Sequence, residues 1–398
     1  MSDQKEHFEA VRMGISRFGT RGIAPVVGVV AVLAILLLGT GAAAACGTSG
    51  PPPTTPTVLD TIPWVNTIAA NSSMVFAQSA VNCTQIWGIT PSGNVSVYAT
   101  IPTPLSQCRE GSLALAPIAI SVGGLPPGPS KLAGSPRNGA DHNGGGSYGG
   151  SDCRNRTNDT LYDVEAGVLY EITDGGSNVQ VVATFHVPTN SAESMGLTYD
   201  QVGTFNHDLV VISSDAGKIW LVNASGNVTF FAELHTFIAG VAVAPSGFGA
   251  YGGDILVAAK TLGEVEAVSP SGNVSVVTSW PKADSVAFPS SGGYGGGHGW
   301  GFGGQCGATC SFGPNHYVFF VANYTSGAVE AFPTSDFRGY SGQGFVAGGQ
   351  NHGIAAFTAS GTTTLFASQT LRLSDIAFIS CFGESHGHGG HWGGGGGW

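Results

Sequence analysis

Charge is scarce in this chain. Only 10% of its 398 residues are Asp, Glu, Lys or Arg, whereas a typical soluble domain has about 25%. The net charge is −11, and no stripe of Lys and Arg is visible along the sequence. Because a nucleic-acid partner is usually held by such a basic stripe, the composition argues against one.

Familiar catalytic motifs are missing as well. The sequence has no HExxH metalloprotease motif, no glycine-rich phosphate loop and no recognisable Ser/His/Asp constellation. Beyond residue 46, no stretch places apolar residues at sustained helical spacing. The chain after that point is therefore predicted to be all-β.

What the chain does contain is a repeated pattern of a short apolar run, a turn and a second apolar run. Clear copies cover residues 87–98, 219–230 and 265–276, and looser copies cover residues 169–182 and 354–366. The Gly-Asn turns of the clear copies tolerate positive φ, and the flanking residues alternate apolar with polar, which is typical of β-hairpins. The copies recur about every 45 to 50 residues, a period typical of propeller blades.

Two further strand-like runs precede most hairpins, which gives the four strands of a propeller blade. Inner strands are predicted at residues 113–115, 197–199, 241–243, 286–288 and 376–378. The last of these has no hairpin after it, and the hairpin at residues 87–98 has no such strand before it. We therefore expect residues 376–378 to pair with residues 74–77, closing the ring with strands from both ends of the chain. The fold class is then an all-β propeller of five four-stranded blades, or six if residues 345–366 form a blade of their own.

The repeat also resembles a known family. Segments such as ESMGLTYD and DLVVISSDAGKIWLVNASGNVTFFAEL look like the repeat shared by NHL, SMP-30/gluconolactonase-like and related propellers. The resemblance covers roughly residues 60–380. It implies a fold and says little about function, since propellers host many unrelated activities.

Residues 23–46 are almost entirely apolar and long enough to span a bilayer as one helix. Four Lys or Arg residues precede this run, and none follows it before Arg109. The positive-inside rule then places residues 1–22 in the cytoplasm and the propeller outside the cell. The sequence thus predicts a single-pass protein of the cell membrane.

The processing of this end stays open among three alternatives. RGIAPVVGVV resembles the signal of archaeal type IV pilin-like proteins, AAAAC offers lipidation at Cys46, and an uncleaved anchor needs neither. Residues 47–58 form a Pro/Thr-rich linker that holds the membrane and the propeller apart. The propeller is assigned to residues 59–381, followed by a Gly/His-rich tail at residues 382–398.

The six cysteines after Cys46 are expected to form disulfides, because their number is even and the domain lies outside the cell. We letter the strands of each blade A to D from the centre outward. The A–B and C–D loops then share one face of the propeller, which we call the A–B face. The B–C and D–A loops share the other face, which we call the D–A face. Cys83 and Cys108 fall on the D–A face and are expected to pair. The other four fall on the A–B face and are expected to pair among themselves: Cys153, Cys306, Cys310 and Cys381.

Nine Asn-x-Ser/Thr sequons make the domain a candidate glycoprotein. They lie at Asn71, Asn82, Asn94, Asn155, Asn158, Asn223, Asn227, Asn273 and Asn323. Asn94, Asn227 and Asn273 lie at equivalent hairpin turns. For these three, the alternative to glycosylation is that Asn is present because it suits the turn geometry.

The tail offers a first candidate metal site. Glu384, His386, His388 and His391 form a flexible donor set that suits Cu(II), Ni(II) or Zn(II). The alternative is a tail without a physiological metal, because the spacing matches no closed structural site.

A second candidate site is the channel mouth on the D–A face. Glu110, Glu193, Asp284 and Asp375 precede or begin inner strands and are expected to surround the central opening. CREGSLALAP resembles the start of SMP-30-type lactonase blades, a resemblance that implies a Glu holding a divalent metal such as Ca. The alternative is a set of polar residues lining a wet channel.

Taken together, these features favour a membrane-anchored extracellular propeller that acts as a binding module. Its ligand would be a surface glycan, an envelope protein or a metal. Two alternatives remain: an SMP-30-like metal-dependent lactonase or hydrolase with its site at the acidic mouth, and a pilin-like filament subunit.

Overall fold

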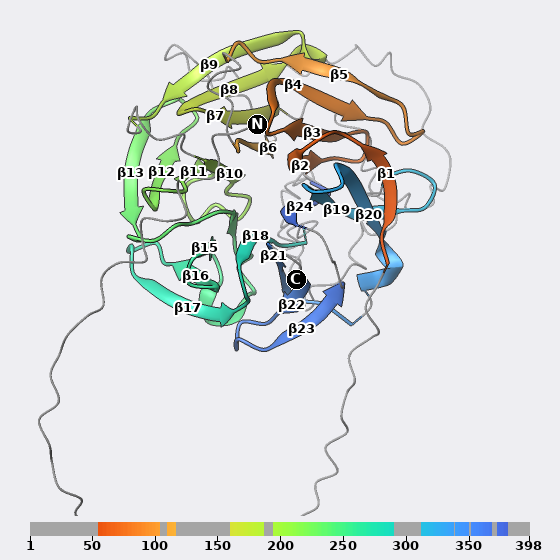
Figure 1. Cartoon of the computed structure of the whole chain (residues 1–398). Coiled ribbons are helices and arrows are strands. Elements are labelled where there is room, and N and C mark those ends of the chain that lie inside the picture. Colours follow the sequence, from red (N-terminus) through yellow and green to blue (C-terminus); the bar gives the residue numbers. More distant parts are fainter. Residues whose placement is uncertain are drawn as a thin grey trace, which may run out of the picture. The chain divides into compact units, whose positions relative to one another are not determined.

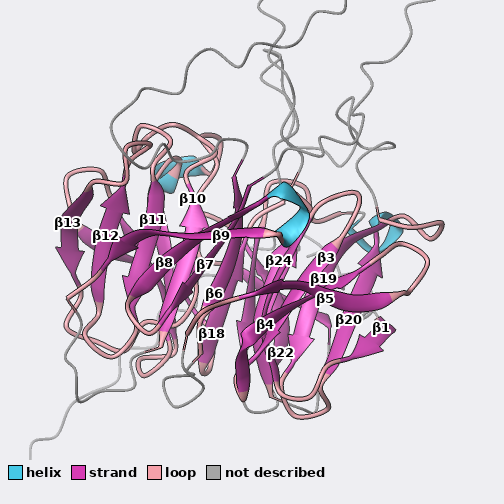
Figure 2. Ribbon diagram, turned by 90° about the horizontal axis from the view of Figure 1, so that it is seen from above, coloured by secondary structure: helices cyan, strands magenta, loops and turns pink. Residues whose placement is uncertain are grey.

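The computed structural model describes residues 55–103, 110–116, 160–186, 194–289, 312–337, 339–349, 352–367 and 372–380. In this part of the chain, 24 strands form six antiparallel sheets of four strands each. The sheets surround a common centre as the blades of a propeller (Figure 1). Figure 2 shows the same blades edge-on.

Blades 1 to 4 each use consecutive strands, written here from the innermost outward. Blade 1 comprises β2 (Val65–Ala70), β3 (Val75–Ser79), β4 (Asn82–Ile89) and β5 (Val95–Thr100). Blade 2 comprises β6 (Ser112–Ala116), β7 (Thr160–Glu165), β8 (Val168–Thr173) and β9 (Asn178–Thr184). Blade 3 comprises β10 (Met195–Tyr199), β11 (Leu209–Ser213), β12 (Lys218–Val222) and β13 (Val228–Glu233). Blade 4 comprises β14 (Val241–Val243), β15 (Ile255–Ala259), β16 (Glu264–Val268) and β17 (Val274–Ser279).

Blades 5 and 6 share the rest of the chain and are interlocked. Blade 5 comprises β18 (Ala283–Ala287), β21 (Gly344–Gly348), β22 (Gly353–Phe357) and β23 (Thr363–Ala367). Blade 6 comprises β24 (Leu373–Phe378), β19 (Tyr317–Asn323), β20 (Ala328–Pro333) and β1 (Thr57–Thr61). The chain therefore starts blade 5, builds the middle of blade 6, returns to finish blade 5, and ends on the innermost strand of blade 6.

The all-β class and the four-stranded blade are confirmed, and the blade count is six. The five predicted inner strands are β6, β10, β14, β18 and β24, and each is innermost in its sheet. Blade 1 has an inner strand of its own, β2, which the sequence pattern did not reveal. Residues 345–366 are not a separate blade, because they supply β21 and β22 and part of β23 to the sheet that β18 begins.

The predicted pairing of residues 376–378 with residues 74–77 is wrong. β24 pairs with β19 in blade 6, whereas β3 pairs with β2 and β4 in blade 1. The reason is that β2 already occupies the inner edge of β3. The ring is nevertheless closed by strands from both ends of the propeller, since β24 is the innermost strand of blade 6 and β1 is its outermost.

A dense aromatic core holds the interlocked blades together. Phe319 on β19 lies 4.5 Å from Phe378 and 5.7 Å from Phe345, measured between ring centroids. Phe337 adds a third ring at 5.6 Å, and all of these side chains are buried. Because these rings come from β19, β21, β24 and the short 3-10 turn Thr334–Phe337, blades 5 and 6 share one core.

Several predicted features lie outside the described residues: the apolar segment 23–46, the flanking residues 1–22, most of the linker, and the Gly/His-rich tail. Within the described ranges, no helix is long and apolar enough to cross a membrane.

Candidate functional site

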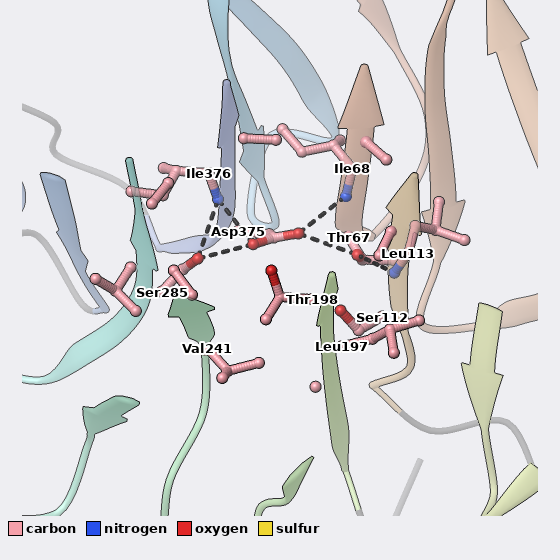
Figure 3. A pocket seen from close by; sticks show the side chains of 18 of the residues that line it. Thr67, Ile68, Ser112, Leu113, Leu197, Thr198, Val241, Ser285, Asp375 and Ile376 are labelled. Atoms are coloured by element: carbon pink, nitrogen blue, oxygen red, sulfur yellow. Dashed lines mark hydrogen bonds between the residues drawn. The ribbon is translucent and has the colours of Figure 1, made fainter. Parts of the chain in front are cut away.

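A central cavity runs along the propeller axis. Its volume is about 180 Å³, and the innermost strands of all six blades contribute to its walls. Each inner strand points alternate side chains inward, and several of these are hydroxyls, among them Thr67, Ser112, Thr198 and Ser285 (Figure 3). The wall of the channel is therefore polar where these hydroxyl groups lie.

Asp375 on β24 is the acidic residue that lies among these hydroxyl groups. Its carboxylate accepts hydrogen bonds from Thr67 Oγ1 at 3.0 Å and from the Ile68 backbone N–H at 3.0 Å, both in blade 1. It also accepts from Ser285 Oγ in blade 5 at 2.8 Å and from the Ile376 backbone N–H at 2.9 Å. Figure 3 shows this carboxylate spanning the gap between the two neighbouring blades. Asp375 thus ties the last strand of the chain to both of its neighbours.

Burial raises the pKa of Asp375 to about 6, even though these hydrogen bonds act in the opposite direction. The Leu113 N–H extends the network into blade 2 by donating to Thr67 Oγ1 at 3.1 Å. Groups of the protein thus supply all the hydrogen bonds that the Asp375 carboxylate accepts, which is the arrangement of a structural anchor.

Asp284 on β18 is paired with a cation. Lys260 Nζ, in the B–C loop of blade 4, lies 2.6 Å from Asp284 Oδ1 and 5.8 Å from the centroid of the Phe237 ring. Burial raises the pKa of Asp284, and the neighbouring ammonium of Lys260 opposes that rise. Of this pair, Asp284 lines the channel.

Glu110, which lines the same cavity, is also paired with a cation. Arg372 Nη2 lies 2.9 Å from Glu110 Oε1. The guanidinium carbon of Arg372 also lies 4.4 Å from the centroid of the Tyr324 ring, a distance typical of cation–π contact. Tyr324 in turn meets Trp64 edge-on at 5.3 Å, and Trp64 is 49% exposed. We call the row Glu110–Arg372–Tyr324–Trp64 the aromatic–ionic row.

The predicted mouth acids are thus brought together in part. Glu110, Asp284 and Asp375 line the same cavity, while Glu193 lies outside the described residues, as do the tail donors Glu384, His386, His388 and His391. In the part of the chain that the structure describes, no three His, Cys, Asp or Glu side chains are grouped so that they could hold a metal ion.

The sequence prediction missed the basic and aromatic half of the mouth. A usable signal existed for Arg372, because it stands directly before inner strand β24 much as Glu110 stands just before inner strand β6. Lys260 and Tyr324 lie in B–C loops, and no repeat pattern marks such positions.

Cys83 on β4 is fully buried and disulfide-bonded. Every other cysteine lies outside the described residues, so the pairing of Cys83 with Cys108 stays a prediction.

The sequons divide by accessibility. Asn94, Asn227 and Asn273 are exposed at their hairpin turns, whereas Asn71 and Asn323 are buried and hydrogen-bonded. Asn82 and Asn223 are half-buried, and Asn155 and Asn158 lie outside the described residues. The three turn sequons are therefore the best placed to carry a glycan, which stays a prediction.

No family model matches this chain, and no curated protein matches it. Solved structures similar to it include virginiamycin B lyase from Staphylococcus aureus, with 12% identity, a TM-score of 0.41, and coverage of 81% of this chain and 78% of that one. The calcium-binding protein regucalcin from Agrobacterium tumefaciens gives 10% identity, a TM-score of 0.46, and coverage of 82% and 83%. A nidogen/laminin complex gives 10% identity, a TM-score of 0.44, and coverage of 80% and 85%. At such identities no activity is transferred to this chain, and the propeller assignment rests on its own strand pairing.

Proposed function

We propose that this chain is a membrane-anchored extracellular binding module that takes a surface glycan at the D–A mouth of its propeller. The observation that carries the proposal is the aromatic–ionic row beside the central channel. Residues 23–46 would anchor the module, and the linker would hold the mouth away from the bilayer.

The row has the chemistry that a sugar ring needs. Trp64 presents an exposed aromatic face, which packs against apolar C–H groups while its polar tip stays wet. Arg372 and Glu110 offer donors and acceptors whose positions are fixed by their mutual ion pair. A few fixed polar groups beside an apolar surface are the usual composition of a small-ligand site.

Binding can be measured on the full-length protein in detergent, first on a glycan array and then by calorimetry with the best oligosaccharide. Trp64→Ala should weaken binding about tenfold or more, as expected for a central aromatic contact. Arg372→Lys keeps the charge but loses the planar fork and should also weaken binding. The matched control is Phe230→Ala, which removes an equally exposed aromatic ring on the outer strand of blade 3. Unchanged affinity in Trp64→Ala, or a protein partner captured independently of Trp64, would contradict the proposal.

A metal-dependent lactonase remains the second candidate, because three carboxylates line one cavity. Against it, Glu110 already contacts Arg372, and Asp284 already contacts Lys260. The Asp375 carboxylate already accepts hydrogen bonds from the protein. The lactonase alternative predicts metal-dependent opening of a sugar lactone that is lost in Glu110→Gln. Such activity would displace the binding-module proposal.

A further inference from the structure

A group of buried oxygen atoms lies between blades 1 and 2, behind the inner strand β6. Asp163 and Glu165 stand two residues apart on β7, so they point to the same side of the strand. That side faces blade 1, because Gln78 of β3 lies 3.4 Å from Asp163, measured from Nε2 to Oδ2. All three side chains have no exposed surface.

The hydrogen bonds of Gln78 fix which way its amide points. Its Nε2 donates to the Cys83 carbonyl at 2.9 Å and toward Asp163, which leaves Oε1 directed elsewhere. Asn66 behaves similarly, since its Nδ2 donates to the Gly111 carbonyl at 3.4 Å. Among the described residues, Gln78 Oε1, Asn66 Oδ1 and Asp163 Oδ1 are buried and have no hydrogen-bond partner.

The position of Gly111 shows that Gln78 Oε1 lies in the same region as Glu165 Oε2 and the Val164 carbonyl oxygen. A Cβ atom at Gly111 would contact Glu165 Oε2 and would lie 2.7 Å from the Val164 carbonyl oxygen and 3.3 Å from Gln78 Oε1. Glycine is therefore required at this position, because carboxylate, amide and backbone oxygens approach its Cα too closely for any side chain.

When the carboxyl groups are ionised, these atoms are all acceptors, so they cannot satisfy one another. Buried polar atoms without partners are costly, and a buried carboxylate needs a compensating charge. A water molecule would donate two protons but would leave the charge of an ionised Asp163 uncompensated. A set of carboxylate, amide and carbonyl oxygens without nitrogen or sulfur is the donor set that Ca²⁺ prefers.

We propose that Asn66, Gln78 and Asp163, together with Glu165, bind a calcium ion that holds blade 1 against blade 2. This site is separate from the channel mouth and from the Gly/His-rich tail. It involves none of the residues of the aromatic–ionic row, so it stands or falls independently of glycan binding.

The first test uses the full-length protein, stripped with EDTA and then titrated with CaCl₂ while its thermal unfolding is followed. Calcium should raise the melting temperature of the wild type, because a ligand of the folded state stabilises it by mass action. Asp163→Asn should abolish this shift. It keeps the shape of the side chain, so the calcium-free protein should melt no lower than the wild type. The control Asp208→Asn alters another carboxylate, in blade 3, and should retain the shift.

A second variant guards against a loss of shift caused by misfolding. Asn66→Asp adds a negative charge to the site, so its calcium-free form should melt lower and its calcium-dependent shift should exceed that of the wild type. An absent shift in the wild type, or an equal shift in Asp163→Asn, overturns the proposal.

Tyr170 supplies a local reporter, because it stands directly opposite Asp163 on β8. Terbium(III) substitutes for calcium and emits when a nearby tyrosine is excited, so the wild type should show sensitised emission that excess calcium removes. Tyr170→Phe should lose most of this emission and keep the calcium-dependent melting shift. Undiminished emission in Tyr170→Phe would place the ion elsewhere and overturn the proposal.

Discussion

Single residues at the centre of the propeller replace contacts that a solid core would provide. The ring leaves an open channel, so the inner strands cannot all pack against one another across it. Asp375 instead forms hydrogen bonds to the two neighbouring blades, with Ser285 in blade 5 and with Thr67 and Ile68 in blade 1. Three blades are thus joined by one half-buried carboxylate, and β24 is fixed in register.

Removing this carboxylate should destabilise the whole domain. Asp375→Ala leaves the Ile68 N–H and the Thr67 and Ser285 hydroxyls without this acceptor, while the Ile376 N–H keeps Ser285 Oγ at 3.3 Å. We expect the free energy of unfolding to fall by about 3 kcal/mol, since each buried donor left unsatisfied costs about 1–3 kcal/mol and relief of the buried charge offsets part of this. Ser285→Ala, which removes one of these bonds, should cost about 1 kcal/mol. Denaturant midpoints measure both, and a variant Asp375→Ala as stable as the wild type would show that the carboxylate is not an anchor.

Residue-level prediction from sequence reached the acids of the mouth but not their partners. Asp284 and Asp375 could be placed because they belong to recognisable inner strands. Lys260 could not, because it belongs to a B–C loop whose position depends on how two neighbouring blades are set against each other. The expectation of a metal at the mouth depended on seeing the acids alone. The cations beside Glu110 and Asp284 change the electrostatics of that surface.

At the scale of elements, strands that belong to a copy of the repeat were predictable, and strands outside the repeat were not. The hairpins that end blades 1 to 5 alternate apolar with polar, because their outer strands face solvent, and all five were found. β19 and β2 are buried along their whole length, so they show no alternation. β19 and β20 also follow a long glycine-rich insertion within blade 5 and pair with strands from both ends of the propeller. Such non-local pairing leaves no trace in a repeat period.

The inserted β19–β20 hairpin should be the least replaceable element of the fold. Phe319 packs among rings from blade 5, from β24 and from the short turn that follows β20. Phe319→Ala should lower the free energy of unfolding by about 3–5 kcal/mol, the usual cost of emptying a buried aromatic site. Phe230→Ala, at an exposed position of β13, should change it by no more than about 0.5 kcal/mol. Similar losses in the two variants would mean that the shared aromatic core does not hold blades 5 and 6.

At the scale of the whole molecule, a chain with few charges buries several of its acids. Asp163 and Asp284 are nearly inaccessible to solvent and Asp375 is half-buried, and burial raises the pKa of each. Half-buried Asp208 has a pKa raised to about 6, by burial and by the nearby carboxylate of Asp200. The folded protein therefore holds protons more tightly than the unfolded chain, in which an aspartate has a pKa of 3.8.

This difference sets the pH dependence of stability. Because the folded-state pKa values lie above the unfolded value, protonation favours the folded state, and stability should increase as the pH falls from about 9 to about 5. Asp163, whose pKa is raised to about 8, contributes to this slope from about pH 8 downward, and Asp375 and Asp208, with pKa values of about 6, add to it below about pH 6. The gain should level off near the unfolded pKa of 3.8. Melting temperatures across this range in calcium-free buffer test the expectation. Asp163→Asn should remove most of the slope above pH 7 and reduce, without abolishing, the slope between pH 7 and 5, to which Asp375 and Asp208 also contribute. A melting temperature that increases with pH would show that these acids are ionised and stabilised in the folded protein.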